Sequence, residues 1–520
     1  MATVEQQSAD ISQNGGGNGR TFAVESPATG DTIAHLPDMD ADQVRELVER
    51  SRAAQKAWGE RSFDDRAAVM YRMRKWMIDN RDRVAQTVME ENGKTREDAL
   101  LADVFITADA LGFWAKKSAS YLADERVRSH STFTLGRKLV VRYRPRGVVG
   151  VIGPWNYPIA NCFGDAIPAL MAGNSVVMKP SEVTPLSSLL VAEGLRASGL
   201  PEDVLLVATG TGETGAALVD QADMIMFTGS TRTGKRIMAQ AADTLTPVSL
   251  ELGGKDPMIV LRDADVERAA NTAVYWGMAN GGQICQSIER VYVEEPVYDE
   301  FVQKVVEKTR ALRQGKPEGS ASVEVGAVTF APQVEIIERH IRDAVDKGAE
   351  VHVGGKLGPG PGRFFEPTVL TGVDHSMEIM TEETFGPTLP IMKVRDEDEA
   401  LRMANDSRYG LNSSVFTKDT VKGERIARQL TAGNACVNDA LINYGATELP
   451  FGGTGESGIG VRHGAAGIQK YCEVQSVLVT RFAPKRDIYM YPYSPAKSKL
   501  VEKLSTALYG RIPRKYRDWA

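Results

Sequence analysis

Apolar side chains recur every three or four residues from about Ala41 to Tyr121, as in the segment DRAAVMYRMRKWMIDNRDRVAQTVMEE. This spacing places them on one face of a helix, so a run of helices is predicted there. From Lys138 onward the pattern changes to short β-branched runs such as GVVGVIG, NSVVMKP and MIMFTGS, which alternate with helical stretches. Strands that alternate with helices predict a parallel, doubly wound sheet.

A second series of strands and helices begins after Gly254 with DPMIVL and RVYVEE. The chain of 520 residues exceeds the roughly 250 to 300 residues at which a single core stops growing, so two large domains are expected. Two further runs, RKLVVRYRP and YCEVQSVLVTR, alternate like strands and are candidates to pair in a small separate sheet.

The predicted fold class is therefore α/β, with a Rossmann-like doubly wound domain, a second α/β domain and a small β element. The pattern divides the chain into six segments. They are a disordered tail over 1–20, a helical lead-in and start of the first domain over 21–137, the Rossmann-like domain over 138–253, the second domain over 254–435, a return to the first domain with a final strand over 436–485, and a basic amphipathic tail over 486–520.

The last segment differs from the rest in charge, because seven Lys and Arg stand against three Asp and Glu after Arg486. Leu500, Leu504 and Leu508 recur at intervals of four and form one apolar stripe on a basic helix. We expect this helix to pack on a neighbouring subunit. Peripheral contact with an anionic membrane surface is the alternative.

Composition narrows the classes of partner. The net charge of −6 offers no broad basic surface for a nucleic acid, so small molecules are the expected ligands. The four cysteines lie apart, without CxxC or Cys/His clusters, which argues against a disulfide framework and against a metal site. A reducing cytoplasm fits this cysteine usage, and neither a secretory signal nor an apolar run of membrane-spanning length is present in the sequence.

Two glycine-rich loops are candidates for phosphate binding. Residues 210–215, GTGETG, fit a dinucleotide fingerprint between a strand and a helix, but no acidic residue follows the next strand, so an ordinary tight turn is an equal alternative. Residues 229–235, GSTRTGK, nearly spell a P-loop. Arg236 stands where magnesium binding requires Ser or Thr, which disfavours an ATPase and leaves a loop that can bind some nucleotide phosphate.

Three polar residues stand in unusual surroundings. Cys285 follows an Asn-Gly-Gly approach in NGGQICQS, whereas Cys162, Cys436 and Cys472 are expected to be small buried apolar residues. Glu251 lies in an apolar strand before two glycines, where an unpaired carboxylate is costly unless it is used. Asn156 sits in PWNYP, a rigid mount for a side-chain amide.

The chain from about residue 25 to 485 resembles the aldehyde dehydrogenase superfamily. The resemblance is carried by eight motifs in the family's order: PWNYP, MKPSE, FTGSTRTG, ELGGK, GGQIC, EETFGP, NDSRYGLNSSVFT and PFGGTGESGIG. It implies NAD(P)-dependent oxidation of an aldehyde to a carboxylic acid. The second α/β domain is then the catalytic domain, and the final strand serves oligomerisation into a homodimer or homotetramer.

The resemblance also implies roles for the three polar residues. Cys285 is the nucleophile that forms a thiohemiacetal and, after hydride transfer, an acyl thioester. Asn156 donates to the oxyanion together with the Cys285 backbone N–H. Glu251 is the base that activates water, and its presence favours hydrolysis over transfer to coenzyme A. The residues implied in cofactor binding are Trp155, Lys179, Glu182, Ser230, Glu383 and Phe385.

The motifs say less about which cofactor and which substrate are preferred. Glu182 would repel a 2′-phosphate, so NAD is expected, with NADP as the alternative. By motif offset the substrate pocket is lined by Phe163, Ala279, Ile284, Gln286 and Tyr444. No arginine stands out as a partner for a substrate carboxylate, yet GGQICQSIERVYV resembles bacterial succinate-semialdehyde dehydrogenases, and that substrate is the alternative to an unspecified aldehyde.

Overall fold

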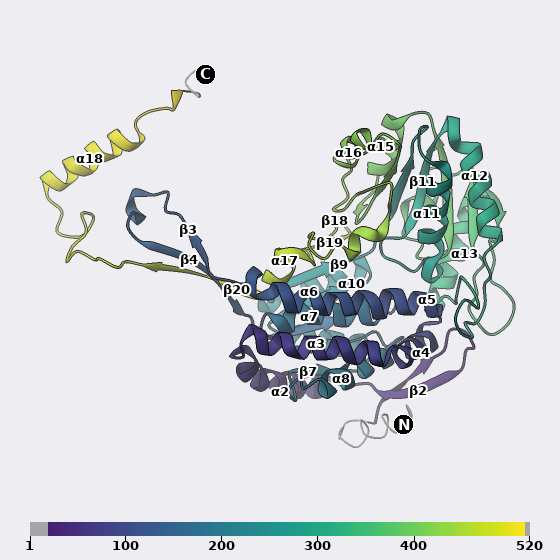
Figure 1. The fold of residues 1–520 in the computed structure, drawn as a ribbon, viewed down its shortest axis with the longest axis horizontal. Coiled ribbons are helices and arrows are strands. Elements are labelled where there is room, and N and C mark those ends of the chain that lie inside the picture. The colour runs from purple at the N-terminus through teal and green to yellow at the C-terminus, as the bar shows by residue number, and fades with distance from the viewer. Residues whose placement is uncertain (1–18, 515–520) are drawn as a thin grey trace. The chain divides into compact units, whose positions relative to one another are not determined.

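The computed structural model describes residues 19–514, so nearly all of the tail predicted over 1–20 lies outside the described residues. Within this range the chain forms two compact units. The larger unit takes its residues from the regions up to 123 and from 143 to 473, and the smaller takes them from 124–142 and from 474 onward. Each unit is therefore built from parts of the chain that are far apart in sequence (Figure 1).

The larger unit begins with a hairpin and a run of helices. Asp40 and Gln43 form a capping box that starts the first long helix, and the left-handed Gly93 ends the third. The helices run from Ala41 to Tyr121, the span predicted from the apolar spacing, and a π-helical segment, Ala99–Phe105, interrupts the last of them. The elements are β1 (Thr21–Glu25), β2 (Thr32–Pro37), α2 (Ala41–Gly59), α3 (Phe63–Asp79), α4 (Arg81–Asn92), α5 (Arg96–Asp98) and α6 (Ile106–Tyr121).

A six-stranded sheet follows, in the order β19-β9-β8-β5-β6-β7. All of its pairs are parallel except that of the edge strand β19, as predicted for a doubly wound sheet. The chain builds outward from β5 in both directions, so the strand order reverses at β5. The strands are β5 (Val148–Ile152), β6 (Ser175–Lys179), β7 (Leu205–Val207), β8 (Met224–Thr228), β9 (Val248–Glu251) and β19 (Gly458–Ile459).

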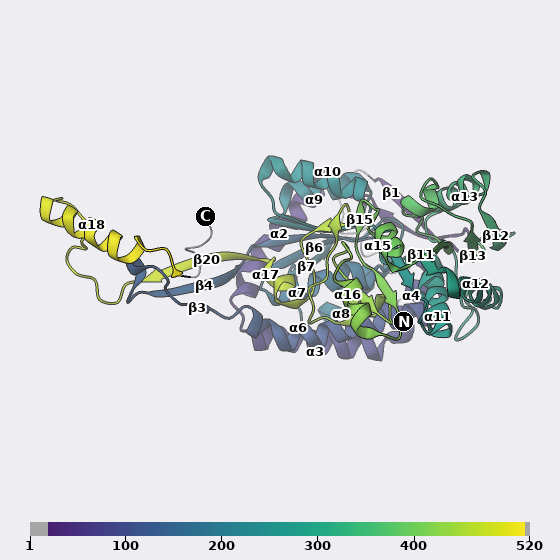
Figure 2. The ribbon, with the colours of Figure 1, turned by 90° about the horizontal axis from the view of Figure 1, so that it is seen from above.

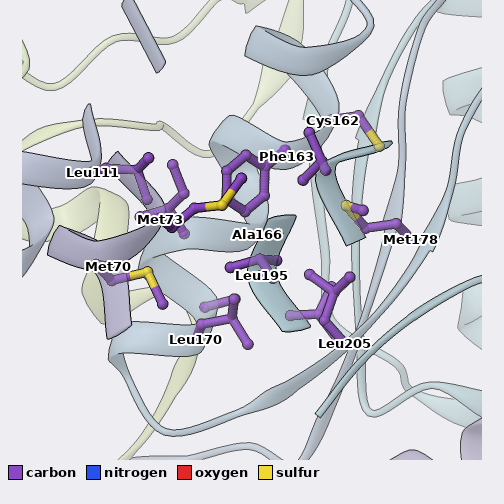
Figure 3. Packing of buried hydrophobic residues seen from close by; sticks show 14 of the residues in the cluster. Met70, Met73, Leu111, Cys162, Phe163, Ala166, Leu170, Met178, Leu195 and Leu205 are labelled. Atoms are coloured by element: carbon purple, nitrogen blue, oxygen red, sulfur yellow. The ribbon is translucent and has the colours of Figure 1, made fainter. Parts of the chain in front are cut away.

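Helices cover both faces of this sheet because alternate strand residues point to opposite sides. Met224 and Met226 pack with the core beneath α3 and α6, whereas Ile225 and Phe227 pack with α2 and two further helices. Figure 3 shows the first of these cores, where Phe163 lies among methionine and leucine side chains. The remaining helices are α7 (Gly164–Met171), α8 (Leu186–Ala197) and α17 (Gly464–Gln469) on the first face, and α9 (Gly212–Gln221) and α10 (Thr231–Ala241) on the second.

The second α/β series forms a seven-stranded sheet in the order β12-β13-β14-β11-β10-β16-β17, with only β12 antiparallel. Helices cover both faces here too (Figure 2). The strands are β10 (Asp256–Val260), β11 (Ile288–Glu294), β12 (Glu350–Val353), β13 (Thr368–Thr371), β14 (Thr388–Val394), β16 (Ser414–Phe416) and β17 (Cys436–Val437), and the helices are α11 (Val266–Met278), α12 (Glu295–Arg310), α13 (Ala331–Asp346), α14 (Glu378–Thr381), α15 (Glu397–Asn405) and α16 (Thr420–Ala427). A short pair, β15 (Tyr409–Gly410) with β18 (Thr454–Gly455), completes the unit.

The smaller unit contains a three-stranded sheet in the order β20-β4-β3 and one helix. The two runs singled out in the sequence, in β4 and β20, are neighbours in this sheet. Leu500, Leu504 and Leu508 on the helix are each between 44% and 49% exposed, and the partner of their stripe stays a prediction. In residues 19–514 no helix is long and apolar enough to cross a membrane. The bounds are β3 (Glu125–Val127), β4 (Lys138–Pro145), β20 (Cys472–Val479) and α18 (Pro495–Tyr509).

Candidate active site

The carboxyl ends of four parallel strands carry most of the residues singled out in the sequence. Asn156 follows β5, Lys179 ends β6, Ser230 follows β8 and Glu251 ends β9. In open α/β sheets ligands bind at this edge, beside the strand where the order reverses. The side chains that were scattered over almost one hundred residues of sequence are thereby gathered at one crevice around β5.

The loop that carries Cys285 has an unusual backbone. Asn280, Gly281 and Gly282 have φ values of 50°, 64° and 72°, so three consecutive residues are left-handed. A Cβ on Gly282 would lie 2.0 Å from the carbonyl oxygen of Gly386, which only glycine avoids. The Asn-Gly-Gly approach therefore brings the thiol loop into backbone contact with the EETFGP segment.

Cys285 is half-buried on the wall of a cavity. Burial raises the pKa of its thiol to about 12, although the positive charge of Arg462 acts in the opposite direction. The charge of Glu251 also raises this pKa, which indicates that the two groups are near one another. At neutral pH the sulfur is therefore protonated, and it needs a base when it attacks a substrate.

Asn156 is buried and reaches the thiol loop directly. Its Nδ2 donates to the carbonyl oxygen of Gln283 at 2.9 Å, two residues before Cys285. Its own backbone carbonyl accepts from Lys94 Nζ at 2.8 Å and from Asn280 Nδ2 at 3.1 Å. The side-chain nitrogen and the backbone of Asn156 are thus both held by hydrogen bonds, which favours a fixed position for this donor.

The network behind Asn156 was not predicted from the sequence. Lys94 and Asp103 form a fully buried ion pair at 2.9 Å, and Asp103 Oδ1 accepts from the backbone N–H of Ile159 and Ala160. The Lys94 ammonium also lies 3.9 Å from the ring centre of Tyr157. In the sequence, a lysine and an aspartate nine residues apart in a helical region look like charged residues on a solvated surface. Their burial becomes visible only in the folded structure.

Glu251 is buried, with 3% of its surface exposed. Its Oε1 has no hydrogen-bond partner among the described residues. Burial raises the pKa of this carboxyl to about 7, while the charges of Arg462 and Lys470 lower it. A carboxyl with such a pKa can accept and release a proton near neutral pH.

Arg462 was not singled out in the sequence, where no arginine stood out as a partner for a substrate carboxylate. The structure places Arg462 on the wall of the cavity beside Cys285. Its Nη2 pairs with Asp165 at 2.8 Å and contacts Thr228, and its Nη1 donates to Asn161 and Tyr444. Both terminal nitrogens are therefore already engaged within the protein.

On the cofactor side, a cation and a helix start lie in the crevice. Lys179 is 4% exposed and its Nζ pairs with Glu182 Oε2 at 3.0 Å. Ser230 is the N-cap of α10, where its hydroxyl accepts from the Thr233 N–H at 3.3 Å. A buried ammonium and the N-terminus of an eleven-residue helix suit a phosphate-bearing dinucleotide.

The other glycine-rich loop, residues 210–215, is occupied by the protein itself. Asp38 Oδ1 accepts from the Thr211 N–H at 3.0 Å and lies within hydrogen-bond distance of the hydroxyls of Thr211 and Thr214. A carboxylate thus stands at the N-terminus of α9, where a phosphate would bind. Of the two alternatives left open by the sequence, the structure favours the ordinary turn.

The EETFGP segment brings Glu383 and Phe385 to the same crevice. Glu383 Oε1 accepts from the Gly254 N–H at 3.0 Å, and burial raises the pKa of Glu383 to about 8. Phe385 has a φ of 49°, and its ring meets that of Trp155 edge to face at 5.2 Å between centroids. Glu289 holds this strained turn by accepting from the Phe385 N–H at 2.8 Å.

The cavity beside Cys285 has a volume of about 410 Å³. Ala279, Ile284, Gln286 and Tyr444 line it, as predicted. Phe163 does not, and that prediction was wrong. Phe163 ends a π-helical turn, Ile159–Phe163, and its ring is fully buried in the core that α3 and α6 form on one face of the sheet (Figure 3). Cys162, Cys436 and Cys472 are buried as expected.

The sequence of this chain is similar to those of known proteins. The model of the aldehyde dehydrogenase family matches residues 15–477. A protein of Mycolicibacterium smegmatis named putative succinate-semialdehyde dehydrogenase [NADP(+)] is 42% identical over 463 residues, which cover 88% of each chain. A 4,4'-diapolycopene aldehyde oxidase of Methylomonas sp is 37% identical and is matched over 94% of this chain and 92% of its own.

The fold has close counterparts among solved structures. The NAD+ complex of an aldehyde dehydrogenase from Bacillus cereus superimposes with a TM-score of 0.85 at 34% identity. The match covers 89% of this chain and 94% of that one.

Proposed function

Because this chain belongs to the aldehyde dehydrogenase family, we propose that it oxidises an aldehyde to a carboxylic acid through a thioester on Cys285. We also propose NAD as the preferred cofactor, on the ground of the Glu182 carboxylate, although the relative that is 42% identical is named for NADP(+). The observation that carries the proposal is the meeting of three groups at one crevice. They are a thiol on a cavity wall, an amide that donates to the thiol loop two residues before Cys285, and a buried carboxyl with a pKa of about 7. Acyl chemistry on sulfur needs such a nucleophile, donor and base.

The first step is attack of the Cys285 sulfur on the aldehyde carbon. The carbon–sulfur bond forms, the carbonyl oxygen takes the negative charge, and the thiol proton leaves to a base. Glu251 is the candidate for that base, because its pKa of about 7 leaves a large fraction ionised at neutral pH. The Asn156 amide and the Cys285 N–H stabilise the oxyanion of the resulting thiohemiacetal.

The crevice around β5 suits a nicotinamide dinucleotide, with Lys179, Glu182 and Ser230 toward the adenosine and pyrophosphate, and Trp155, Glu383 and Phe385 toward the nicotinamide ribose. When bound, the oxidised nicotinamide ring supplies the hydride acceptor. Before hydrolysis Glu251 releases to solvent the proton that it took from the thiol. It then takes a proton from water while the hydroxide adds to the thioester carbonyl. When the carbon–sulfur bond breaks, Glu251 returns this proton to the sulfur, and the acid and the thiol are released.

The proposal predicts that the purified chain reduces NAD only when an aldehyde is added, and that it reduces NADP less efficiently. Glu182 is the reason, because a carboxylate beside the adenosine ribose repels a 2′-phosphate. Absorbance of the reduced nicotinamide, followed with both cofactors and with short, long, aromatic and carboxylated aldehydes, measures this. If neither cofactor is reduced with any of these aldehydes, the proposal that the chain is an oxidoreductase is wrong.

Asn156 gives a second prediction. Replacement by alanine removes one oxyanion donor and should lower kcat by about a hundredfold or more. The binding of NADH, measured by fluorescence, should change little, because Asn156 faces the thiol loop. If kcat stays within threefold of the unsubstituted chain, Asn156 does not meet the oxyanion.

A second candidate function is oxidation of succinate semialdehyde in particular. It is favoured by the name of the relative that is 42% identical. It requires a cationic group that is free to pair with the distal carboxylate of the substrate.

A further inference from the structure

We propose that the substrate is a long or bulky apolar aldehyde whose tail extends from Cys285 through the first cavity into a second one. The inference rests on the proposed function and names its substrate class. Three observations support it: the apolar lining of two adjoining cavities, two glycines that line the first cavity, and the positions of the charged groups.

The first cavity is mostly apolar around the thiol. Aromatic rings and aliphatic chains from α6, α11 and the segment before β18 form its walls, and a pocket of about 410 Å³ is in the range of sites that enclose a drug-sized ligand. The apolar wall residues that bear on the argument are Leu101, Phe105, Trp114, Tyr275, Trp276 and Leu441.

Two glycines enlarge this cavity. A Cβ built on Gly164 or on Gly445 would have no atom within 4 Å, and both residues line the cavity. Gly164 has φ −52° and ψ −37°, which every residue adopts, and it begins helix α7. Since glycine in a helix is about 1 kcal/mol less favourable than alanine, the backbone gives no reason for it. The empty space beside Gly164 in the cavity gives a reason, because a side chain at this position would occupy that space.

A second cavity of about 830 Å³ adjoins the first. The two share the walls formed by Asp98, Leu101, Phe105, Tyr275 and Ala279. Leu101 and Phe105, in the π-helical segment, are 47% and 63% exposed and present apolar surface to both cavities. A tail that is too long for the first cavity would reach the second one past these shared side chains, of which Ala279 is the smallest.

The charged groups on the first cavity do not suit a small carboxylated aldehyde. Both terminal nitrogens of Arg462 are engaged by Asp165 and its neighbours. Lys470 Nζ contacts Ser249 Oγ and Met226 Sδ, each at 3.2 Å, on strands β9 and β8. Asp98 and Asp165 add negative charge, and burial lowers the pKa of His463 to about 3, so this histidine is neutral.

The test compares specificity constants along a series of straight-chain aldehydes from propanal to tetradecanal, with retinal and succinate semialdehyde beside them. Cyclodextrin at a constant concentration keeps the poorly soluble aldehydes in solution. Burial of each further methylene should raise kcat/KM by up to about fourfold until the apolar path is filled. Succinate semialdehyde should be among the slowest substrates.

Gly164→Ala and Gly164→Leu form a graded pair at one position. Leucine fills the first cavity, so the ratio of kcat/KM for dodecanal to that for propanal should fall at least tenfold, whereas alanine should lower it only slightly. Ala279→Phe narrows the junction of the two cavities and should lower the same ratio. Ala216→Leu, at an exposed position of α9, controls for an added leucine and should leave the ratio unchanged.

The outcomes separate the inference from the proposed function. If succinate semialdehyde is oxidised at least tenfold more efficiently than decanal, or if Gly164→Leu leaves the ratio unchanged, the substrate class is wrong while aldehyde oxidation stands. If no aldehyde of the series is oxidised with either cofactor, the proposed function itself fails.

Discussion

Replacement of Cys285 by alanine should lower kcat for aldehyde oxidation by at least about 10⁴-fold, because no covalent intermediate can form without the sulfur. The aldehyde then has no thiohemiacetal from which to lose hydride, and reduction of NAD should fall to the background of the assay. Steady-state rates at saturating aldehyde measure the effect.

The matched control is Cys436→Ala. Cys436 is also buried, in β17, but it does not line the cavity beside Cys285. This variant should keep the rate within a few fold of the unsubstituted chain. A Cys285→Ala protein that retains a tenth of the activity would contradict the thioester mechanism.

Glu251→Gln should separate the two halves of the reaction. Glutamine cannot take a proton from water, so hydrolysis of the thioester should slow by about 10² to 10⁴-fold. Because Glu251 is also the candidate base for the Cys285 thiol, rapid mixing should show the first equivalent of reduced cofactor per site forming more slowly than in the unsubstituted chain, followed by almost no turnover. Mass spectrometry of the quenched protein should find the acyl group on the peptide that contains Cys285.

The same carboxyl sets the expected pH dependence. Burial raises the pKa of Glu251 to about 7, and only its ionised form accepts a proton, so the hydrolysis rate should rise as pH increases through about 7 and level off above it. The Glu251→Gln variant should lose this rise of the rate with pH. Glu202 is an exposed carboxylate before β7, and the Glu202→Gln variant should keep the rise. A profile that is identical in the glutamine variant would assign the base to another group.

Local patterns in the sequence were enough to predict the class of fold and the residues that can carry the chemistry. Period-3.6 apolar spacing predicted the helices over Ala41–Tyr121, and short β-branched runs predicted a doubly wound sheet, because these patterns are local and each element must bury its apolar side. Cys285, Glu251 and Asn156 were recognisable because glycine, tryptophan and proline neighbours make such polar residues unusual, and because the motif order resembles one family.

The tertiary structure alone decided which groups surround those residues. Lys94, Asp103 and Arg462 carry no local signal, because a charged side chain has the same sequence pattern whether it is solvated or buried. The buried partner lies nine residues away for Lys94 and Asp103, and 297 residues away for Arg462 and Asp165. Phe163 was predicted to line the pocket and lies in the core, because a single π-helical turn changes the direction in which its ring points. Pocket shape and buried pairing depend on contacts between distant segments, and those contacts exist only once the chain has folded.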